Sequence, residues 1–136
     1  MGVKAEAKGS LSVIEQGELA FTIEQDADPI EVSASTWFTV TVRNIGRVDH
    51  NVQLAMQLPS GSKALKVDAP VKHQILGDQL VFEPIPQMDS RAVQKIRVEV
   101  GNFQIGTQIV RAQLKSQNRP TPVIKEEATD VYNDRN

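Results

Sequence analysis

Apolar and polar residues alternate with a period of two along much of this sequence, and this alternation limits the possible folds more than any other feature does. It is clearest at residues 38–43, where Phe38, Val40 and Val42 are separated by threonines and followed by an arginine. Successive side chains of a β-strand point to opposite faces of the sheet, so the pattern predicts a strand with one buried and one solvated face. Three further segments share it, at residues 52–58, 96–100 and 110–115.

Turn-forming residues lie between the alternating segments. They form clusters at residues 44–46, 59–61, 77–78, 88–90 and 118–120. Gly77 and Asp78 separate two short apolar runs, which predicts a tight hairpin whose glycine adopts a positive φ. Weaker strand patterns occur at residues 19–24, 30–33, 64–67 and 123–131. No window of ten or more residues shows the apolar stripe and capping residues of a helix.

The number and spacing of these segments predict the fold class. About seven to nine short strands, each with one apolar face, are typical of an all-β, immunoglobulin-like antiparallel β-sandwich. A chain of 136 residues fits one such domain, which we expect at residues 18–132. Residues 1–17 are polar and are interpreted as a linker or a segment derived from expression, and residues 133–136 as a polar tail.

Composition excludes several classes of function. The 15 basic and 17 acidic residues give a net charge of −2 and are spread along the chain, so we expect no nucleic-acid partner. The absence of cysteine rules out disulfides, cysteine nucleophiles and thiolate metal sites. No stretch reaches the roughly 18 to 20 apolar residues of a membrane span, and the start lacks the apolar run of a signal peptide. We therefore expect a soluble chain without direct membrane insertion, and interpret it as one piece of a longer protein.

One set of motifs resembles a known family. Residues 38–46, followed by Asn51-Val52 and by residues 58–61, resemble the bacterial conserved-repeat domain known as domain of unknown function number eleven, in which a Tyr-x-Ile-x-Val-x-Asn-x-Gly strand end precedes a Leu-Pro-x-Gly turn. This chain has Phe38 for the usual tyrosine and Gln57 where an acidic residue is common. Residues 80–85 and 125–132 look like the fifth and last strands of that family, so the resemblance extends from about Leu19 to Tyr132.

The resemblance implies a fold and a setting. Such domains are similar to immunoglobulin-like surface modules, often in tandem within large secreted or envelope proteins, and they carry no recognised catalytic motif. It implies a location that is extracellular or in the cell envelope, with neighbouring domains of the parent chain or other surface proteins as partners. Asn44 and Gly46 are then expected to close a turn that needs unusual backbone angles, and Pro59 with Gly61 to end a strand sharply.

Residues suited to catalysis are few. The two histidines, His50 and His73, lie far apart in the sequence, and the candidate nucleophiles Ser60, Ser62 and Ser90 are not set in a Gly-x-Ser-x-Gly motif. No histidine spacing typical of a zinc site occurs. We expect no catalytic residue, no cofactor and no metal ligand, and therefore no enzyme activity.

Two features keep a binding function open. Asp26 and Asp28 precede Pro29 at a bend where hard oxygen ligands could converge on calcium, with Asp49 or Asp130 as candidates to complete the shell; a solvated acidic turn is the interpretation we favour. Trp37 is out of phase with the apolar residues of its strand, so it is predicted on the outer face of a sheet, partly covered or available to a glycan or a neighbouring domain.

Two functional hypotheses follow from these observations. The first is a non-catalytic structural or interaction module in a larger secreted or cell-envelope protein of bacteria. The alternative is a calcium-binding or glycan-binding β-sandwich module, whose loops at one end would carry the site.

Overall fold

The computed structural model describes residues 19–133, in which the chain forms eleven strands and no helix. The predicted segment 1–17 and residues 134–136 of the predicted tail lie outside the described residues. The strands are β1 (Leu19–Gln25), β2 (Ile30–Glu31), β3 (Thr36–Asn44), β4 (Asp49–Gln57), β5 (Lys63–Asp68), β6 (His73–Leu76), β7 (Gln79–Phe82), β8 (Ile85–Met88), β9 (Val93–Gly101), β10 (Gly106–Lys115) and β11 (Val123–Tyr132).

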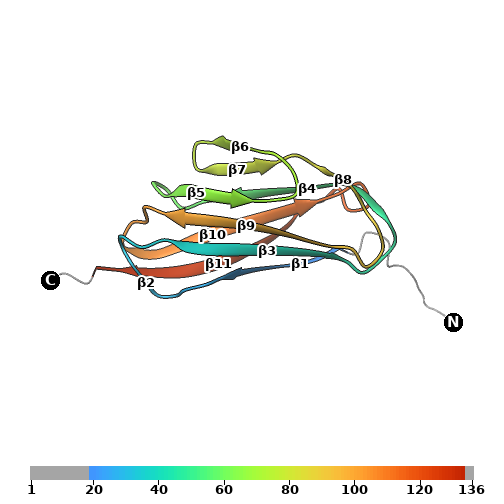
Figure 1. Cartoon of the computed structure of the whole chain (residues 1–136). Coiled ribbons are helices and arrows are strands. Elements are labelled where there is room, and N and C mark those ends of the chain that lie inside the picture. The colour runs from blue at the N-terminus through green and yellow to red at the C-terminus, as the bar shows by residue number, and fades with distance from the viewer. Residues whose placement is uncertain (1–18, 134–136) are drawn as a thin grey trace.

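Two sheets pack face to face as a sandwich (Figure 1). One has four strands in the order β1-β3-β9-β5, and the other has seven, in the order β2-β11-β10-β4-β7-β6, with β8 paired to β4. The predicted all-β, immunoglobulin-like sandwich is confirmed. Eleven strands exceed the predicted seven to nine, and β8 is the strand that was not anticipated. The pairing of β2 with β11 is parallel, while every other pairing described is antiparallel.

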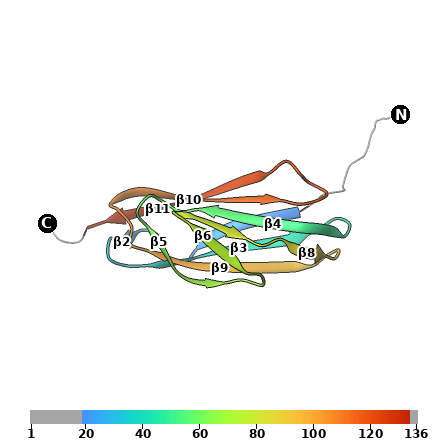
Figure 2. The ribbon, with the colours of Figure 1, turned by 90° about the horizontal axis from the view of Figure 1, so that it is seen from above.

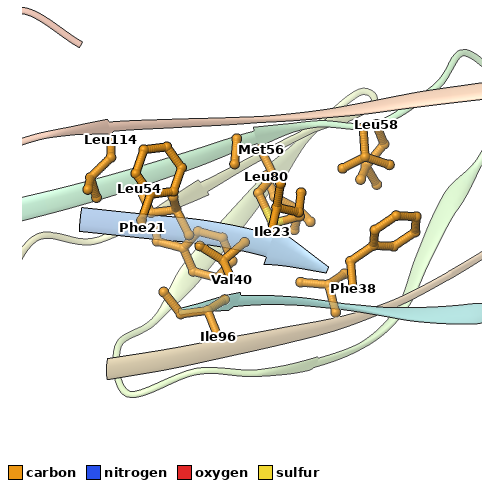
Figure 3. Packing of buried hydrophobic residues seen from close by; sticks show 14 of the residues in the cluster. Phe21, Ile23, Phe38, Val40, Leu54, Met56, Leu58, Leu80, Ile96 and Leu114 are labelled. Carbon is orange, nitrogen blue, oxygen red and sulfur yellow. The ribbon is translucent and has the colours of Figure 1, made fainter. Parts of the chain in front are cut away.

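The core lies between the sheets and follows the alternation of the sequence. On β3, the side chains of Phe38, Val40 and Val42 are fully buried, while the residues between them are half-buried or exposed on the outer face. Leu54 and Met56 of β4 face them from the other sheet (Figure 3). Burying an aliphatic or aromatic side chain of this size contributes about 1.5 to 3 kcal/mol. The alternation therefore determines both the strands and the face on which they pack.

Residues 80–85, which resemble a single strand of the family, belong to two strands, β7 and β8, and both pair with β4. The second half of β4 pairs with β7 and its first half with β8, and Pro84 lies between these two partners. Pro86 lies within β8, where its missing N–H is tolerated because β8 pairs with β4 alone. Because Pro84 and Pro86 disfavour a strand in sequence-based prediction, β8 is identified only by its pairing with β4.

Polar side chains join the sheets along the side formed by β1 and β11. The side-chain amide of Gln25 donates to Glu127 Oε2 at 3.0 Å and to the backbone carbonyl of Ala128 at 2.7 Å. The hydroxyl of Thr129, a fully buried residue, donates to Gln25 Oε1. These bonds fix the first described strand to the last.

The first described strand begins at one end of the sandwich and the last one ends at the other. Strand β1 begins at the end that carries loops 45–48, 89–92 and 116–122, whereas β11 ends at the opposite end, with loops 26–29, 32–35, 58–62 and 102–105 (Figures 1 and 2). Strands of nine or ten residues span roughly 30 Å at about 3.3 Å per residue. The described part of the chain contains no helix long and apolar enough to cross a membrane.

The predicted hairpin at residues 77–78 is confirmed. Leu76 pairs with Gln79 across a two-residue turn, and Gly77 has a φ of 68°. A second glycine, Gly61, has a φ of 83° and is the third residue of the turn that runs from Pro59 to Ser62 and follows the end of β4, as the family resemblance implied. Glycine is required at both turns because a side chain would be strained in this conformation.

Candidate functional site

The loop after β3 is organised by a buried asparagine. Asn44 is 1% exposed, and its amide nitrogen donates to the backbone carbonyls of Arg47, at 2.8 Å, and Met88, at 2.9 Å. Its side-chain oxygen accepts the N–H of Gly46 at 2.9 Å. The expectation of unusual backbone angles at Gly46 is wrong, since Gly46 is not among the residues with positive φ. The turn is closed by the Asn44 side chain instead.

A buried aspartate organises the neighbouring loops. Asp49 is 1% exposed, and its Oδ2 accepts the hydroxyl of Ser116 at 2.5 Å. Its Oδ1 accepts the backbone N–H groups of His50, at 2.8 Å, and Asn118, at 3.0 Å. These bonds fix the start of β4 to the loop between β10 and β11. Asp49 therefore has a structural role, and it lies at the opposite end of the sandwich from the predicted calcium bend.

Arginines and apolar side chains gather at the end organised by Asn44 and Asp49. A shallow cleft of about 390 Å³ is lined by Arg43, Asn44, Ile45, Arg91 and Val93. Ile45 is 58% exposed and Val93 44%, so the cleft combines exposed apolar surface with two arginines. Arg47, in the loop held by Asn44, is also exposed. We call the surface formed by Arg43, Ile45, Arg47, Arg91 and Val93 the basic end.

Carboxylates gather at the opposite end. Asp28 accepts the backbone N–H of Asp130 at 2.9 Å, and Asp130 accepts the hydroxyl of Thr107 at 2.9 Å. A carboxylate oxygen of Asp26 lies 3.9 Å from the guanidinium of Arg97. We call the surface formed by Asp26, Asp28, Glu31 and Asp130 the acidic end.

The predicted calcium bend thus brings together only part of its proposed ligands. Asp28 and Asp130 are neighbours, in agreement with one of the two alternatives, but Asp49 begins β4 and is bonded to Asn118 at the opposite end of the sandwich. Among residues 19–133 there is no group of three or more histidine, cysteine or acidic residues arranged to hold a metal ion. The carboxylates at this end bond to the protein itself.

We expect the melting temperature to be the same in EDTA and in millimolar calcium. A ligand that binds only the native state, at a hundred times its dissociation constant, would add about 2.7 kcal/mol and raise the melting temperature by several degrees. Thermal unfolding followed by circular dichroism measures this. A melting temperature that is higher in calcium for the natural chain, but not for the Asp26→Asn, Asp28→Asn variant, would contradict the expectation and establish a calcium site.

Trp37 lies on the outer face of the four-stranded sheet, as predicted. It is half-buried, and the guanidinium of Arg97 lies over its ring, 4.5 Å from the centroid. A cation over the ring stabilises this arrangement and occupies one face of the indole. Trp37 is thus partly covered by a neighbouring strand, which leaves it a poor platform for stacking a sugar ring.

Two of the candidate catalytic residues make contacts within the fold. His73 packs near Phe82, with ring centroids 5.9 Å apart, and the hydroxyl of buried Ser62 donates to the carbonyl of Pro59 at 2.6 Å. Within residues 19–133, no hydrogen bond joins the side chain of either histidine to a serine.

A further surface was not anticipated from the sequence. On the outer face of the seven-stranded sheet, side chains of Gln79, Gln113 and Arg111 border a depression of about 270 Å³ over Ala55. In the described part of the chain the side-chain amides of Gln79 and Gln113 form no hydrogen bond with the protein, whereas Gln57 beside them donates to Asp78 at 2.8 Å. The signal in the sequence is that several polar positions of these strands, among them Gln57, Gln79 and Gln113, are glutamines. We call Gln79, Gln113 and Arg111 the amide surface.

Comparison with solved structures supports the fold. BslA, a bacterial hydrophobin, is 19% identical with a TM-score of 0.60, and the match covers 90% of this chain and 99% of BslA. The CARDB domain of a Pyrococcus furiosus protein, solved with di-metal ions, is 11% identical with a TM-score of 0.57, over 90% of this chain and all of that domain.

A third match concerns one part of a much larger enzyme. It is a family 20 exo-β-N-acetylglucosaminidase from Vibrio harveyi, 10% identical, with a TM-score of 0.50. The match covers 85% of this chain but only 18% of the enzyme. No family model matches the sequence, so the conserved-repeat family is not assigned. At these identities the likeness is one of fold, which hosts many functions.

Proposed function

We propose that this chain is a non-catalytic structural module of a larger secreted or cell-envelope protein of bacteria, in which it holds neighbouring domains apart. The observation that carries the proposal is the path of the chain, since β1 begins at one end of the sandwich and β11 ends at the other. Flanking domains attached in this way are separated by the length of the strands, roughly 30 Å.

The use of buried polar side chains supports the same role. Asn44 and Asp49 bond to neighbouring loops, and Ser62 bonds to the carbonyl of Pro59 within its own turn. Such bonds stiffen the connections between strands, which suits a spacer. The resemblance to surface modules of bacteria and the match to BslA support an extracellular or envelope location.

The location and the spacing are tested separately. Antibodies against residues 19–133 should label intact cells of the source bacterium or detect the protein in its medium. Exclusive recovery from the cytoplasm would overturn the envelope assignment.

The spacing role is tested by replacement. An unrelated sandwich of equal end-to-end length, put in place of residues 19–133 in the parent protein, should preserve the function of that protein, whereas a short flexible linker should not. Loss of function with both replacements would refute the spacer role.

The amide surface favours a second candidate, which is glycan binding. The amides of Gln79 and Gln113, beside an arginine that is itself paired with Glu126, offer both donors and acceptors to the hydroxyl groups of a polysaccharide chain lying in the depression. This site differs from the one near Trp37 that the sequence indicated.

For this candidate, the Gln79→Ala, Gln113→Ala variant should bind insoluble polysaccharide about tenfold more weakly than the natural chain. Each lost hydrogen bond contributes about 1 kcal/mol or less to binding. Sedimentation with chitin, cellulose and peptidoglycan measures the bound fraction. Gln117→Ala, at an exposed position of another loop, is the control. Absence of binding by the natural chain to all three polymers would argue against the candidate.

A further inference from the structure

The two ends of the sandwich carry opposite charge. At the basic end, Arg43, Arg47 and Arg91 are all exposed. The exposed carboxylate in the same loop as Arg91 is that of Asp89, and it accepts a hydrogen bond from Gln87 at 2.7 Å. Asp49 is buried there and occupied by its three donors. The solvent-facing charge of this end is therefore dominated by guanidinium groups.

The acidic end presents the complementary surface. Asp26, Asp28 and Asp130 are exposed, and Glu31 is half-buried. Lys63 begins β5 at this end, and the guanidinium of Arg97 lies 3.9 Å from a carboxylate oxygen of Asp26, so these two cations offset part of the acidic charge. Ile105, in the loop between β9 and β10, is 58% exposed among these groups. Both ends thus combine charge with exposed aliphatic side chains.

We propose that copies of this chain associate end to end, with the basic end of one against the acidic end of the next. Contact between two like ends is disfavoured by charge repulsion, whereas unlike ends attract. A contact between two different surfaces of the same chain does not close on itself and extends into a linear row.

The path of the chain fits this arrangement. Because β1 begins at the basic end and β11 ends at the acidic end, consecutive copies in one polypeptide would turn the acidic end of the first toward the basic end of the second. The inference rests on the proposed structural role in that respect. Contacts between exposed charges are weak and salt-sensitive, so separate molecules should associate only at high concentration, and covalent linkage would strengthen the contact.

The test is sedimentation velocity of the full chain over a concentration series up to about 1 mM, in about 20 mM and about 500 mM salt. At low salt the average mass should rise above the 15.0 kDa of the single chain, and it should return to that value at high salt. A mass that stays at the single-chain value at every concentration in low salt would overturn the proposal. Association that is indifferent to salt would do the same.

Charge reversal identifies the surfaces. The Arg43→Glu, Arg91→Glu variant has two acidic ends, and the Asp26→Lys, Asp28→Lys variant has two basic ends. Each alone should associate at least about tenfold more weakly than the natural chain, and an equimolar mixture should restore association, because opposite ends then meet again. Undiminished association of either variant alone, or a mixture that remains monomeric, would refute the assignment.

Two controls keep the test decisive. Thermal unfolding must show that each variant folds, and Asp26→Lys alone replaces the double variant if the loss of the Asp28 hydrogen bond prevents folding. Lys95→Glu, on the outer face of the four-stranded sheet, is the matched reversal and should leave association within about twofold of the natural chain. Failure of self-association would leave the location and spacing experiments unaffected, so the two proposals fail separately.

Discussion

Changing Asn44 to aspartate is expected to lower the free energy of unfolding by about 4 kcal/mol. The substitution keeps the shape of the side chain and the bond from Gly46 but removes both N–H donors, so the carbonyls of Arg47 and Met88 lose their partners. Each unsatisfied buried carbonyl costs about 1 to 3 kcal/mol, and a carboxylate aimed at two carbonyl oxygens adds repulsion.

Urea unfolding monitored by Trp37 fluorescence measures this change. The control is Asn102→Asp, because Asn102 is exposed and its side-chain amide donates one hydrogen bond, to the carbonyl of Gly61 at 3.0 Å. The control should cost less than about 1 kcal/mol. Equal losses for the two variants would show that the Asn44 bonds do not organise the loop.

Replacing Asp49 by alanine is expected to cost about 3 kcal/mol. The change leaves the hydroxyl of Ser116 and the backbone N–H groups of His50 and Asn118 without their acceptor, in a region from which water is largely excluded. It should also loosen the loop between β10 and β11, which Asp49 fixes to β4.

The free energy of unfolding and hydrogen exchange of the Asn118 amide together test this role. Asp89→Ala is the control, since Asp89 is exposed and its carboxylate accepts one side-chain hydrogen bond, from Gln87, while its backbone bond from Ala92 is kept. The control should change stability by less than about 0.5 kcal/mol. If Asp49→Ala unfolds at the same urea concentration as the natural chain, the hydrogen bonds to the Asp49 carboxylate do not contribute measurably to stability.

The strands that pack on both sides of the core were predictable from sequence. In β3, β4, β9 and β10 the apolar period of two coincides with burial, because each strand has a solvated outer face on which polar residues remain. The hairpin at Gly77 was predictable because a two-residue turn favours a residue with positive φ, which glycine adopts without steric strain. Strand β8 was not, since its two prolines read as a break and its pairing depends on the distant strand β4.

The surfaces were harder to predict than the fold. The outward position of Trp37 and the exposed Asp26 followed from local pattern, but the Arg97 side chain over the indole depends on the pairing of β3 with β9. The opposite charges of the two ends are invisible in a sequence whose acidic and basic residues are evenly spread. They appear only when the topology decides which loops share an end.

The end-to-end path of the chain also determines how the domain would bear a mechanical load. Tension from flanking segments would be applied where β1 begins and where β11 ends, and these two strands run in the same direction and are joined by Gln25, Glu127 and Thr129. The hydrogen bonds of a sheet lie across its strands, so a pull along the long axis would shear the rows of bonds together instead of unzipping them one at a time. A domain threaded this way is suited to carry tension between the parts of a larger protein.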